Sequence, residues 1–292
     1  MGNRCDALII GAGVVGASIS LELSRAGLKT INVDPNPSVG YGSTSSSSAI
    51  IRTHYSTREG TLLAWESLLH WRDWAGYLGL EESETLAQFR ESGVVVLKAH
   101  EEGFEAWKLH HRALGIPFEE WDRETLRQRV PHLSMKSYGP PKTPDDPAFL
   151  EANSQEIFGA IYLPHSGYVN DPQLAARNLK SAAQLIGAQF IFGDRVIEIA
   201  RRTGRVTGAR LESGEQIEAG IIVNAAGPHS FLVNRMAGVT EDMNVSTRPM
   251  RHEVHYVPGL PDQDKRTIDV VLSDDDVGVY CCLLYTSDAA DD

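Results

Sequence analysis

The fold is decided by the stretch Asp6–Asp34, which reads DALIIGAGVVGASISLELSRAGLKTINVD. It begins with a short apolar run of strand length, and the glycine-rich turn Gly11-Ala12-Gly13-Val14-Val15-Gly16 follows. Residues 17–26 have a helical pattern, and residues 29–33 form a second apolar run. The stretch therefore predicts strand, turn, helix and strand in succession, which is one βαβ unit.

The three glycines of this turn have the spacing of a dinucleotide site. The first allows a tight turn, the second lets a pyrophosphate approach the backbone, and the third lets the helix pack against the strand. The helix N-terminus offers N–H groups and a positive dipole end to phosphates. The acid that ends the second strand can accept hydrogen bonds from ribose hydroxyls. The alternative is a glycine-rich turn in an unrelated α/β fold. The predicted site consists of Gly11, Gly13, Val14, Val15, Gly16 and Asp34.

The loop after Asp34 bears on the choice between FAD and NAD. A plain nicotinamide dehydrogenase would continue with further strand–helix pairs, but residues 40–48 read GYGSTSSSS. Backbone amides and hydroxyls in such a loop suit a second contact on a longer cofactor. A flexible linker is the alternative, because Gly and Ser also give that.

Bulk composition limits the class of protein. The 292 residues are 42% hydrophobic and 23% charged, which is typical of a packed globular chain. The net charge of −12 argues against nucleic acid as a partner, because phosphate binding needs excess Lys and Arg. Three cysteines without a CxxC pair give no disulfide framework, and no apolar run reaches membrane-spanning length. We expect a cytoplasmic protein without a transmembrane segment.

Several motifs in order resemble a known family, the D-amino-acid oxidase superfamily of FAD-dependent oxidoreductases. Within it the sequence is most similar to the sarcosine oxidase and dimethylglycine dehydrogenase branch, from about Asp6 to Cys281. The motifs are GAGVVGASISLELSRAG at 11–27, GSTSSSSAIIR at 42–52, GAIYLPHSGYVNDPQL at 159–174, VIEI at 196–199 and NAAGP at 224–228.

The resemblance implies roles for particular residues. The glycine turn would hold the ADP part of FAD, and the Ser/Thr loop would pass beside the pyrophosphate and flavin. The strand at Val196 would contact adenine through its backbone, and Arg52 would bind the substrate carboxylate over the flavin. For Arg52 the alternative is an ion pair on the surface or between domains. The further cofactor residues implied are Ser43, Thr44, Ser45, Val196, Ala225, Ala226 and Gly227.

The resemblance also implies an architecture. We expect an α/β, Rossmann-like FAD-binding domain assembled from discontinuous segments, with an interwoven α+β substrate domain built on an antiparallel sheet. Residues 57–78 are expected to form one helix, residues 245–257 and 268–280 to alternate as strands, and Asp274–Asp276 to form a solvated turn. The predicted bounds are 1–85 and 150–235 for the FAD-binding domain, 86–149 and 236–282 for an incomplete substrate domain, and 283–292 for a non-native tail.

The resemblance implies oxidation of the C–N bond of an amino acid or N-methylated amine, with hydride passing to flavin. Oxygen or a redox partner would be the electron acceptor. In the families that the sequence resembles, a covalent flavin bond is made by a cysteine farther along the chain or by a histidine of the early loop. Residues 45–48 contain no histidine, and Cys281 and Cys282 come too early, so FAD is expected to bind non-covalently. We expect no metal site, and His252 and His255 face opposite sides if they lie on one strand. The alternatives are oxidation of a 2-hydroxy acid and a flavin-binding assembly factor without turnover.

Overall fold

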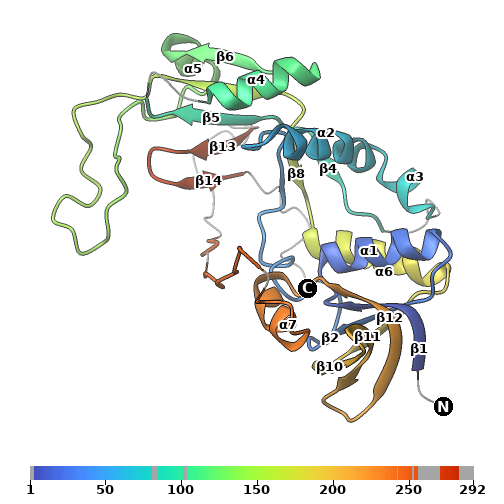
Figure 1. Ribbon diagram of the computed structural model, residues 1–292. Coiled ribbons are helices and arrows are strands. Elements are labelled where there is room, and N and C mark those ends of the chain that lie inside the picture. Colours follow the sequence, from blue (N-terminus) through green and yellow to red (C-terminus); the bar gives the residue numbers. More distant parts are fainter. Residues whose placement is uncertain are drawn as a thin grey trace, which may run out of the picture. The chain divides into compact units, whose positions relative to one another are not determined.

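The structure is a computed structural model that describes residues 3–80, 85–100, 104–241, 243–251, 253–255 and 270–282. The chain forms two compact units, each assembled from separate segments (Figure 1). Of the described residues, unit 1 contains those within 1–47, 74–87 and 171–255, and unit 2 contains those within 48–73, 88–170 and 256–292. These bounds differ from the predicted ones, because residues 48–73 and 150–170 belong to unit 2 and residues 236–255 to unit 1.

Unit 1 contains a six-stranded sheet in the order β10-β11-β12-β1-β2-β9. The strands from β12 to β9 pair in parallel, whereas β10, β11 and β12 pair antiparallel. The glycine turn follows β1 at the carboxyl end of this parallel part. The strands are β1 (Asn3–Ile10), β2 (Thr30–Asp34), β9 (Gln189–Phe192), β10 (Val196–Arg202), β11 (Arg205–Leu211) and β12 (Gln216–Asn224).

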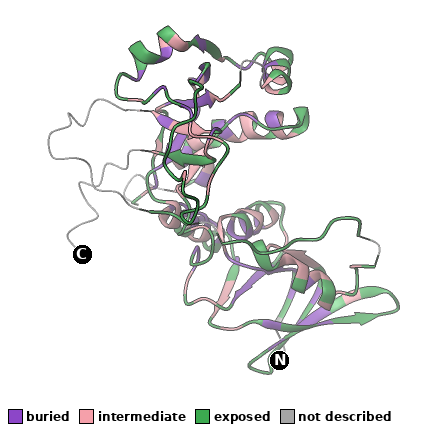
Figure 2. Cartoon of the chain, turned by 90° about the vertical axis from the view of Figure 1, so that its left-hand side faces the viewer, coloured by how far each residue is buried: buried purple, intermediate pink, exposed green. Residues whose placement is uncertain are grey.

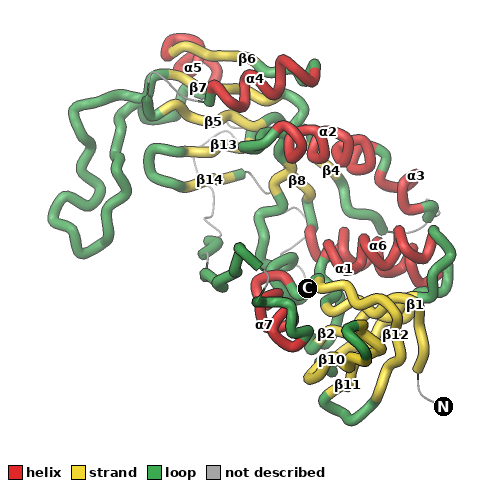
Figure 3. The backbone as a smooth tube through the Cα atoms, in the orientation of Figure 1, coloured by secondary structure: helices red, strands yellow, loops and turns green. Residues whose placement is uncertain are grey.

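Helices α1 (Val14–Arg25) and α6 (Pro172–Leu185) lie side by side against this sheet (Figure 3). Small buried residues on both helices, Ala17 on α1 and Ala176 on α6 among them, permit the close approach. The predicted start of α6 is confirmed, since the carboxylate of Asp171 accepts the N–H of Leu174 at 2.8 Å. Unit 1 also contains α3 (Trp74–Leu78), a 3₁₀ turn (Gly227–His229) and α7 (Ser230–Met236).

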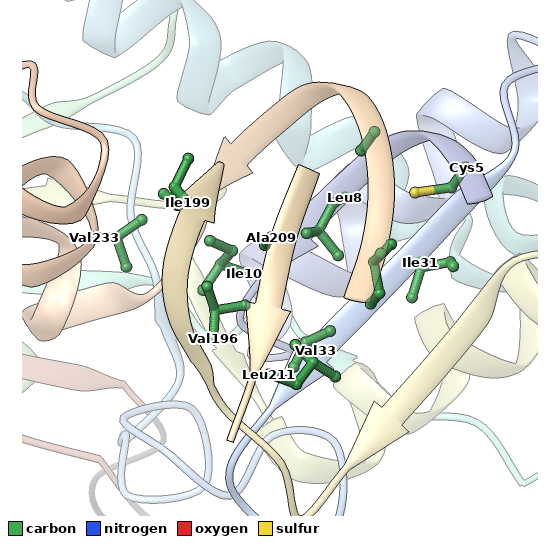
Figure 4. Packing of buried hydrophobic residues seen from close by; sticks show 12 residues of the cluster. Cys5, Leu8, Ile10, Ile31, Val33, Val196, Ile199, Ala209, Leu211 and Val233 are labelled. Carbon is green, nitrogen blue, oxygen red and sulfur yellow. The ribbon is translucent and has the colours of Figure 1, made fainter. Parts of the chain in front are cut away.

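Strands β1, β2, β10, β11 and β12 share a buried apolar cluster that α7 completes (Figure 4). Burying a side chain of Leu, Ile or Val size contributes about 1.5–3 kcal/mol, so this cluster holds the parallel and antiparallel parts of the sheet together. Its members are Cys5, Leu8, Ile10, Ile31, Val33, Val196, Ile199, Ala209, Leu211, Ile217, Ala219 and Val233.

Unit 2 is built on a five-stranded sheet in the order β14-β13-β5-β7-β6, antiparallel except where β13 pairs with β5. Alternate residues of β5 enter two clusters: Val94 and Val96 pack with Trp107 of α4, and Val95 and Leu97 pack with Leu126 of α5. Strand β5 is therefore buried on both faces, whereas the two edge strands of the sheet are mostly exposed (Figure 2). The elements are β5 (Val94–Lys98), α4 (Glu105–Leu114), β6 (Glu119–Asp122), α5 (Arg123–Arg129), β7 (Gly159–Leu163), β13 (Val271–Asp274) and β14 (Val279–Cys281).

A smaller sheet in unit 2 has the order β3-β8-β4. It consists of β3 (Ile50–Ile51), β8 (Gly167–Val169) and β4 (Phe89–Arg90), all paired antiparallel. Helix α2 (Arg58–Arg72) follows β3 along the chain, and the hydroxyl of Thr57 caps its N-terminus. The mixed α/β architecture with several sheets agrees with the predicted fold class.

Three local predictions are corrected. The single helix expected over residues 57–78 is wrong, since α2 ends at Arg72 and α3 begins at Trp74. The strand expected over residues 245–257 is wrong for residues 245–251 and 253–255, which have no regular structure. The turn between β13 and β14 is not fully solvated: Asp276 is 8% exposed because its carboxylate binds Ser137, Tyr138 and Gly139. His252, residues 256 and 257, and the tail 283–292 lie outside the described residues.

Candidate functional site

The turn after β1 has room only for glycine at two of its three glycine positions. Gly11 has a φ of +111°, and a Cβ there would lie 2.3 Å from the carbonyl oxygen of Ala225. A Cβ on Gly16 would lie 2.2 Å from the carbonyl oxygen of Gly11. The missing side chains therefore let β1, α1 and the end of β12 meet backbone to backbone.

Gly13 borders the N-terminus of α1, the place where a phosphate group would bind. It is the N-cap residue and has no side chain that could satisfy the helix N–H groups. The hydroxyl oxygen of Thr44 accepts the N–H of Val14 at 3.0 Å, and a Cβ on Gly13 would lie 3.1 Å from that hydroxyl. Val15, the next residue of the helix, is 61% exposed. The first turn of α1 thus faces outward beside the Ser/Thr loop.

The Ser/Thr loop is fixed to the glycine turn at its start. The N–H of Gly40 donates to the carbonyl oxygen of Ala12 at 2.9 Å, and the N–H of Ser45 donates to the carbonyl oxygen of Gly40 at 2.9 Å. Ser43 and Ser45 are exposed, whereas Thr44 is half-buried against α1. Of the three predicted loop residues, Thr44 is the one in direct contact with the helix N-terminus.

Asp34 ends β2 beside the same turn. One carboxylate oxygen accepts the N–H of Ala12 at 2.7 Å, and the other accepts the backbone and side-chain N–H groups of Asn36 at 2.9 and 3.0 Å. An ionised carboxylate offers about four acceptor sites, so a ribose hydroxyl still has a place to donate. The contacts hold the carboxylate in one orientation.

The turn after β12 lies next to the glycine turn, because β1 and β12 are parallel neighbours whose carboxyl ends share one edge. The N–H of Ala225 donates to the carbonyl oxygen of Ile10 at 2.9 Å. The side-chain oxygen of Asn224 accepts the N–H of Ala226 at 3.2 Å. Gly227 has a φ of +55° and starts the 3₁₀ turn. The structure thus brings Ala225 together with Gly11 and Gly16.

Two predicted residues lie elsewhere. Val196 begins β10, and its side chain is buried in the apolar cluster, so only its backbone could contact a ligand. Arg52 follows β3 in unit 2, whereas all the other predicted site residues lie in unit 1. Its guanidinium carbon lies 4.8 Å from the ring centroid of Tyr55.

The positive charge of Arg52 affects the pKa values of two nearby groups. Burial raises the pKa of Asp275, and the positive charge of Arg52 opposes that rise. Burial lowers the pKa of His54 to about 3, and the charge of Arg52 contributes to the lowering. His54 is therefore neutral at physiological pH, and its ring packs against Trp107 with centroids 4.3 Å apart.

Sequence reasoning missed the asparagines that hold these turns. Asn32, Asn36 and Asn224 each donate or accept hydrogen bonds at the glycine turn, at Asp34 or at the turn after β12. The available signal for Asn32 was its single amide side chain within the buried strand TINVD. A polar residue in such a strand needs a partner, and here the partners are turn carbonyls.

The arrangement fits the pyrophosphate and ribose of a dinucleotide. It combines an outward-facing helix N-terminus whose own N-cap residue has no side chain, a glycine where a side chain would approach the ligand, and an oriented carboxylate at the end of the next strand. Within the described ranges, no group of three His, Cys, Asp or Glu side chains is placed to hold a metal ion. None of the helices described has the length and apolar character that a membrane crossing requires.

Comparison with known proteins gives distant relatives. The chain is 26% identical over 235 residues to a glycerol 3-phosphate dehydrogenase of Caloramator mitchellensis, covering 79% of this chain and 43% of the relative. It is 22% identical over 266 residues to a D-amino acid dehydrogenase of Methylobacterium radiotolerans, covering 80% of this chain and 63% of the relative. The chain therefore spans roughly half the length of these two proteins.

The fold is shared with a solved glycine oxidase from Geobacillus kaustophilus, with a TM-score of 0.70 at 20% identity over 96% of this chain and 68% of that one. Residues 6–286 match the FAD dependent oxidoreductase (DAO) family, whose name implies FAD as the cofactor. The match confirms the predicted superfamily and does not test the predicted branch. With nearly its whole length matched, the chain belongs to the FAD-dependent oxidoreductase (DAO) family.

Proposed function

We propose that this protein is an enzyme that binds FAD non-covalently and oxidises the C–N bond of an amino acid or N-methylated amine. The sarcosine, dimethylglycine and D-amino-acid types are the substrates that we propose. The observation that carries the proposal is the joint placement of Gly13, Thr44 and Asp34 around the N-terminus of α1, in a chain of an FAD-dependent family.

The proposed contacts of FAD follow from this geometry. The N–H of Val15 would donate to the pyrophosphate, and so would the N–H of Val14 once it leaves the hydroxyl of Thr44, to which it donates here. The carboxylate of Asp34 would accept from the adenosine ribose. The Ser/Thr loop and the turn after β12 lie alongside, and the backbone at Val196 contacts adenine. The residues that would hold the cofactor are Gly11, Gly13, Val14, Val15, Gly16, Asp34, Ser43, Thr44, Ser45, Val196, Ala225, Ala226 and Gly227.

FAD, when bound, supplies a hydride acceptor for the carbon attached to the substrate nitrogen. The part that we assign to this chain is substrate binding by Arg52, whose planar guanidinium can pair bidentately with a carboxylate. Arg52 is exposed, and no carboxylate of the described chain lies within ion-pair distance of it. That favours a ligand over the alternative of a structural ion pair.

A second function is oxidation of a C–O bond, as in 2-hydroxy acids or phosphorylated alcohols. The observation that favours it is the relationship to a protein named glycerol 3-phosphate dehydrogenase. The two functions differ in product, because C–N oxidation releases an amine, ammonia or formaldehyde after hydrolysis of the imine, whereas C–O oxidation gives a carbonyl compound alone.

The test is the absorbance spectrum of the purified protein before and after anaerobic addition of candidate substrates. Flavin bands that bleach with sarcosine, dimethylglycine or a D-amino acid would support the proposal. Bleaching only with 2-hydroxy acids or glycerol 3-phosphate would support the second function. A protein without flavin that also fails to take up added FAD would contradict both functions.

Arg52→Ala tests the proposed carboxylate contact separately. We expect the variant to keep its FAD and to show a KM for carboxylate-bearing amines raised by roughly 10- to 10²-fold, because a charge-assisted pair is worth about 1.5–3 kcal/mol. Arg58→Ala is the matched control, since Arg58 is also an exposed arginine of unit 2, at the first position of α2. Equal KM values for the two variants would remove Arg52 from the substrate site.

A further inference from the structure

Asn32 is an amide side chain buried completely in the middle of β2. Its exposed fraction is 0%, and it faces α1, on the same side of the strand as Thr30. Its side-chain nitrogen donates to the carbonyl oxygen of Gly11 at 3.2 Å and to that of Gly16 at 3.1 Å. Both amide protons are therefore used on the first and third glycines of the turn.

The contact to Gly11 fixes the orientation of one peptide group. In a trans peptide the C=O of one residue and the N–H of the next point in opposite directions. The C=O of Gly11 points to Asn32, and the N–H of Ala12 points to the carboxylate of Asp34 at 2.7 Å. Two side chains of the same strand thus hold the two sides of the Gly11–Ala12 peptide, one residue before Gly13.

The contact to Gly16 ties the first turn of α1 to the same amide. Because one side chain binds both Gly11 and Gly16, it sets the distance between the start of the turn and the start of the helix. The helix N–H groups that follow Gly13 are the proposed phosphate ligands. Their direction therefore depends on the residue at position 32.

The oxygen of the Asn32 side chain indicates that the residue is needed for the hydrogen bonds that its nitrogen donates. That oxygen is buried and has no hydrogen-bond partner. An unsatisfied buried acceptor is unfavourable, and an apolar residue of the same size would avoid the cost. The amide group is therefore explained by what its nitrogen binds.

We propose that Asn32 is a positioning residue for FAD: through Gly11 and Gly16 it holds the glycine turn in the conformation that receives the pyrophosphate. The inference rests on the proposed function, since it assigns a ligand to the same turn. Within the described part of the chain, the hydrogen bonds of the Asn32 side chain go to backbone carbonyls of the turn, so its effect on the cofactor acts through the turn.

Thr30 provides a matched control on the same strand. It is 2% exposed, and its hydroxyl makes hydrogen bonds with Ser20 at 3.0 Å and Ser24 at 2.9 Å on α1. Removing that hydroxyl disturbs the same strand–helix interface without touching the glycine turn. Thr30→Val therefore measures how much stability is lost when a buried polar contact is removed and the glycine turn is left intact.

The experiment measures the dissociation constants of FAD and of ADP for the wild-type protein, Asn32→Leu and Thr30→Val, together with their thermal unfolding midpoints. FAD is removed first, and binding is followed by flavin fluorescence and by calorimetry. We expect Asn32→Leu to raise both dissociation constants by about tenfold or more, and Thr30→Val to leave both unchanged while lowering the midpoint. Equal loss for FAD and ADP would place the effect on the ADP part of the cofactor.

The outcomes separate the inference from the proposed function. Wild-type and Asn32→Leu proteins that bind FAD equally well would overturn the inference and leave the proposed function standing. A wild-type protein that binds neither FAD nor ADP would overturn both. If Asn32→Leu does not fold, NMR of the wild-type protein decides: the side-chain amide protons of Asn32 should shift when ADP is added, and unchanged resonances at saturating ADP would overturn the inference.

Discussion

Replacing Gly16 by alanine tests the claim that the glycine turn depends on backbone contact. The added Cβ would lie 2.2 Å from the carbonyl oxygen of Gly11 and 2.9 Å from its carbonyl carbon. Both of these atoms are main chain, so no side chain can rotate away. The helix or the end of β1 must move by roughly 1 Å to restore ordinary contact.

The size of the effect follows from two opposing contributions. Overpacking of a close-packed site costs about 1–3 kcal/mol, and we expect the upper end because the neighbours are backbone. Alanine in a helix is more favourable than glycine by about 1 kcal/mol, and Gly16 lies within α1. The free energy of unfolding should therefore fall by about 2 kcal/mol, which lowers the melting midpoint by roughly 4–8 °C in a domain of this size.

The assay is thermal unfolding of Gly16→Ala beside Gly220→Ala. Gly220 lies on β12 of the same sheet, its φ is not positive, and a Cβ there would meet nothing within 4 Å. The control variant should be as stable as the wild-type protein or slightly more stable, because alanine reduces the freedom of the unfolded chain. If Gly16→Ala melts at the same temperature as Gly220→Ala, the backbone-contact argument is refuted.

Three further predictions concern other sites. Gly13→Val should retain its fold but lose FAD, because its side chain would stand beside Thr44 on the path to the helix N-terminus; flavin absorbance after gel filtration checks this. Asp276→Ala should lower the free energy of unfolding by about 3 kcal/mol in urea titrations, since two backbone N–H groups and one hydroxyl lose their shared acceptor. The pKa of His54 falls from 6.5 to about 3 on folding. Between these two pH values the unfolded chain binds more protons than the folded chain, so the free energy of unfolding should fall as the pH drops through this range. Between pH 7 and pH 5 we expect a loss of about 2 kcal/mol that His54→Phe does not show.

The βαβ unit could be predicted because its signals are local. The apolar runs, the glycine spacing and the acid at Asp34 lie within one short stretch, and β1, α1 and β2 form where expected. The start of α6 was predictable for the same reason, because Asp171 and Pro172 act on the next few residues. In each case the residues that decide the structure are near neighbours in the chain.

Other features depend on contacts that the local sequence does not contain. Asp276 looked like part of a solvated turn because its partners begin 139 residues earlier, at Ser137. The alternating pattern over residues 245–257 predicted a strand, although alternation produces one only when a neighbouring strand is available to pair. The break at Asp73 was missed because the apolar period continues into α3, yet α2 and α3 belong to different units.

The cofactor is easier to infer from this chain than the substrate, for a physical reason. The dinucleotide turn is defined by positions that have no side chain. At Gly11 and Gly16 the neighbouring backbone atoms leave no room for the Cβ of any other residue. A carboxylate-binding group such as Arg52 is exposed, so packing does not restrict which residue stands there. Proteins named for glycine, D-amino acids and glycerol 3-phosphate can therefore all be similar to this chain at 20–26% identity. The substrate must consequently be read from flavin bleaching rather than from the glycine turn.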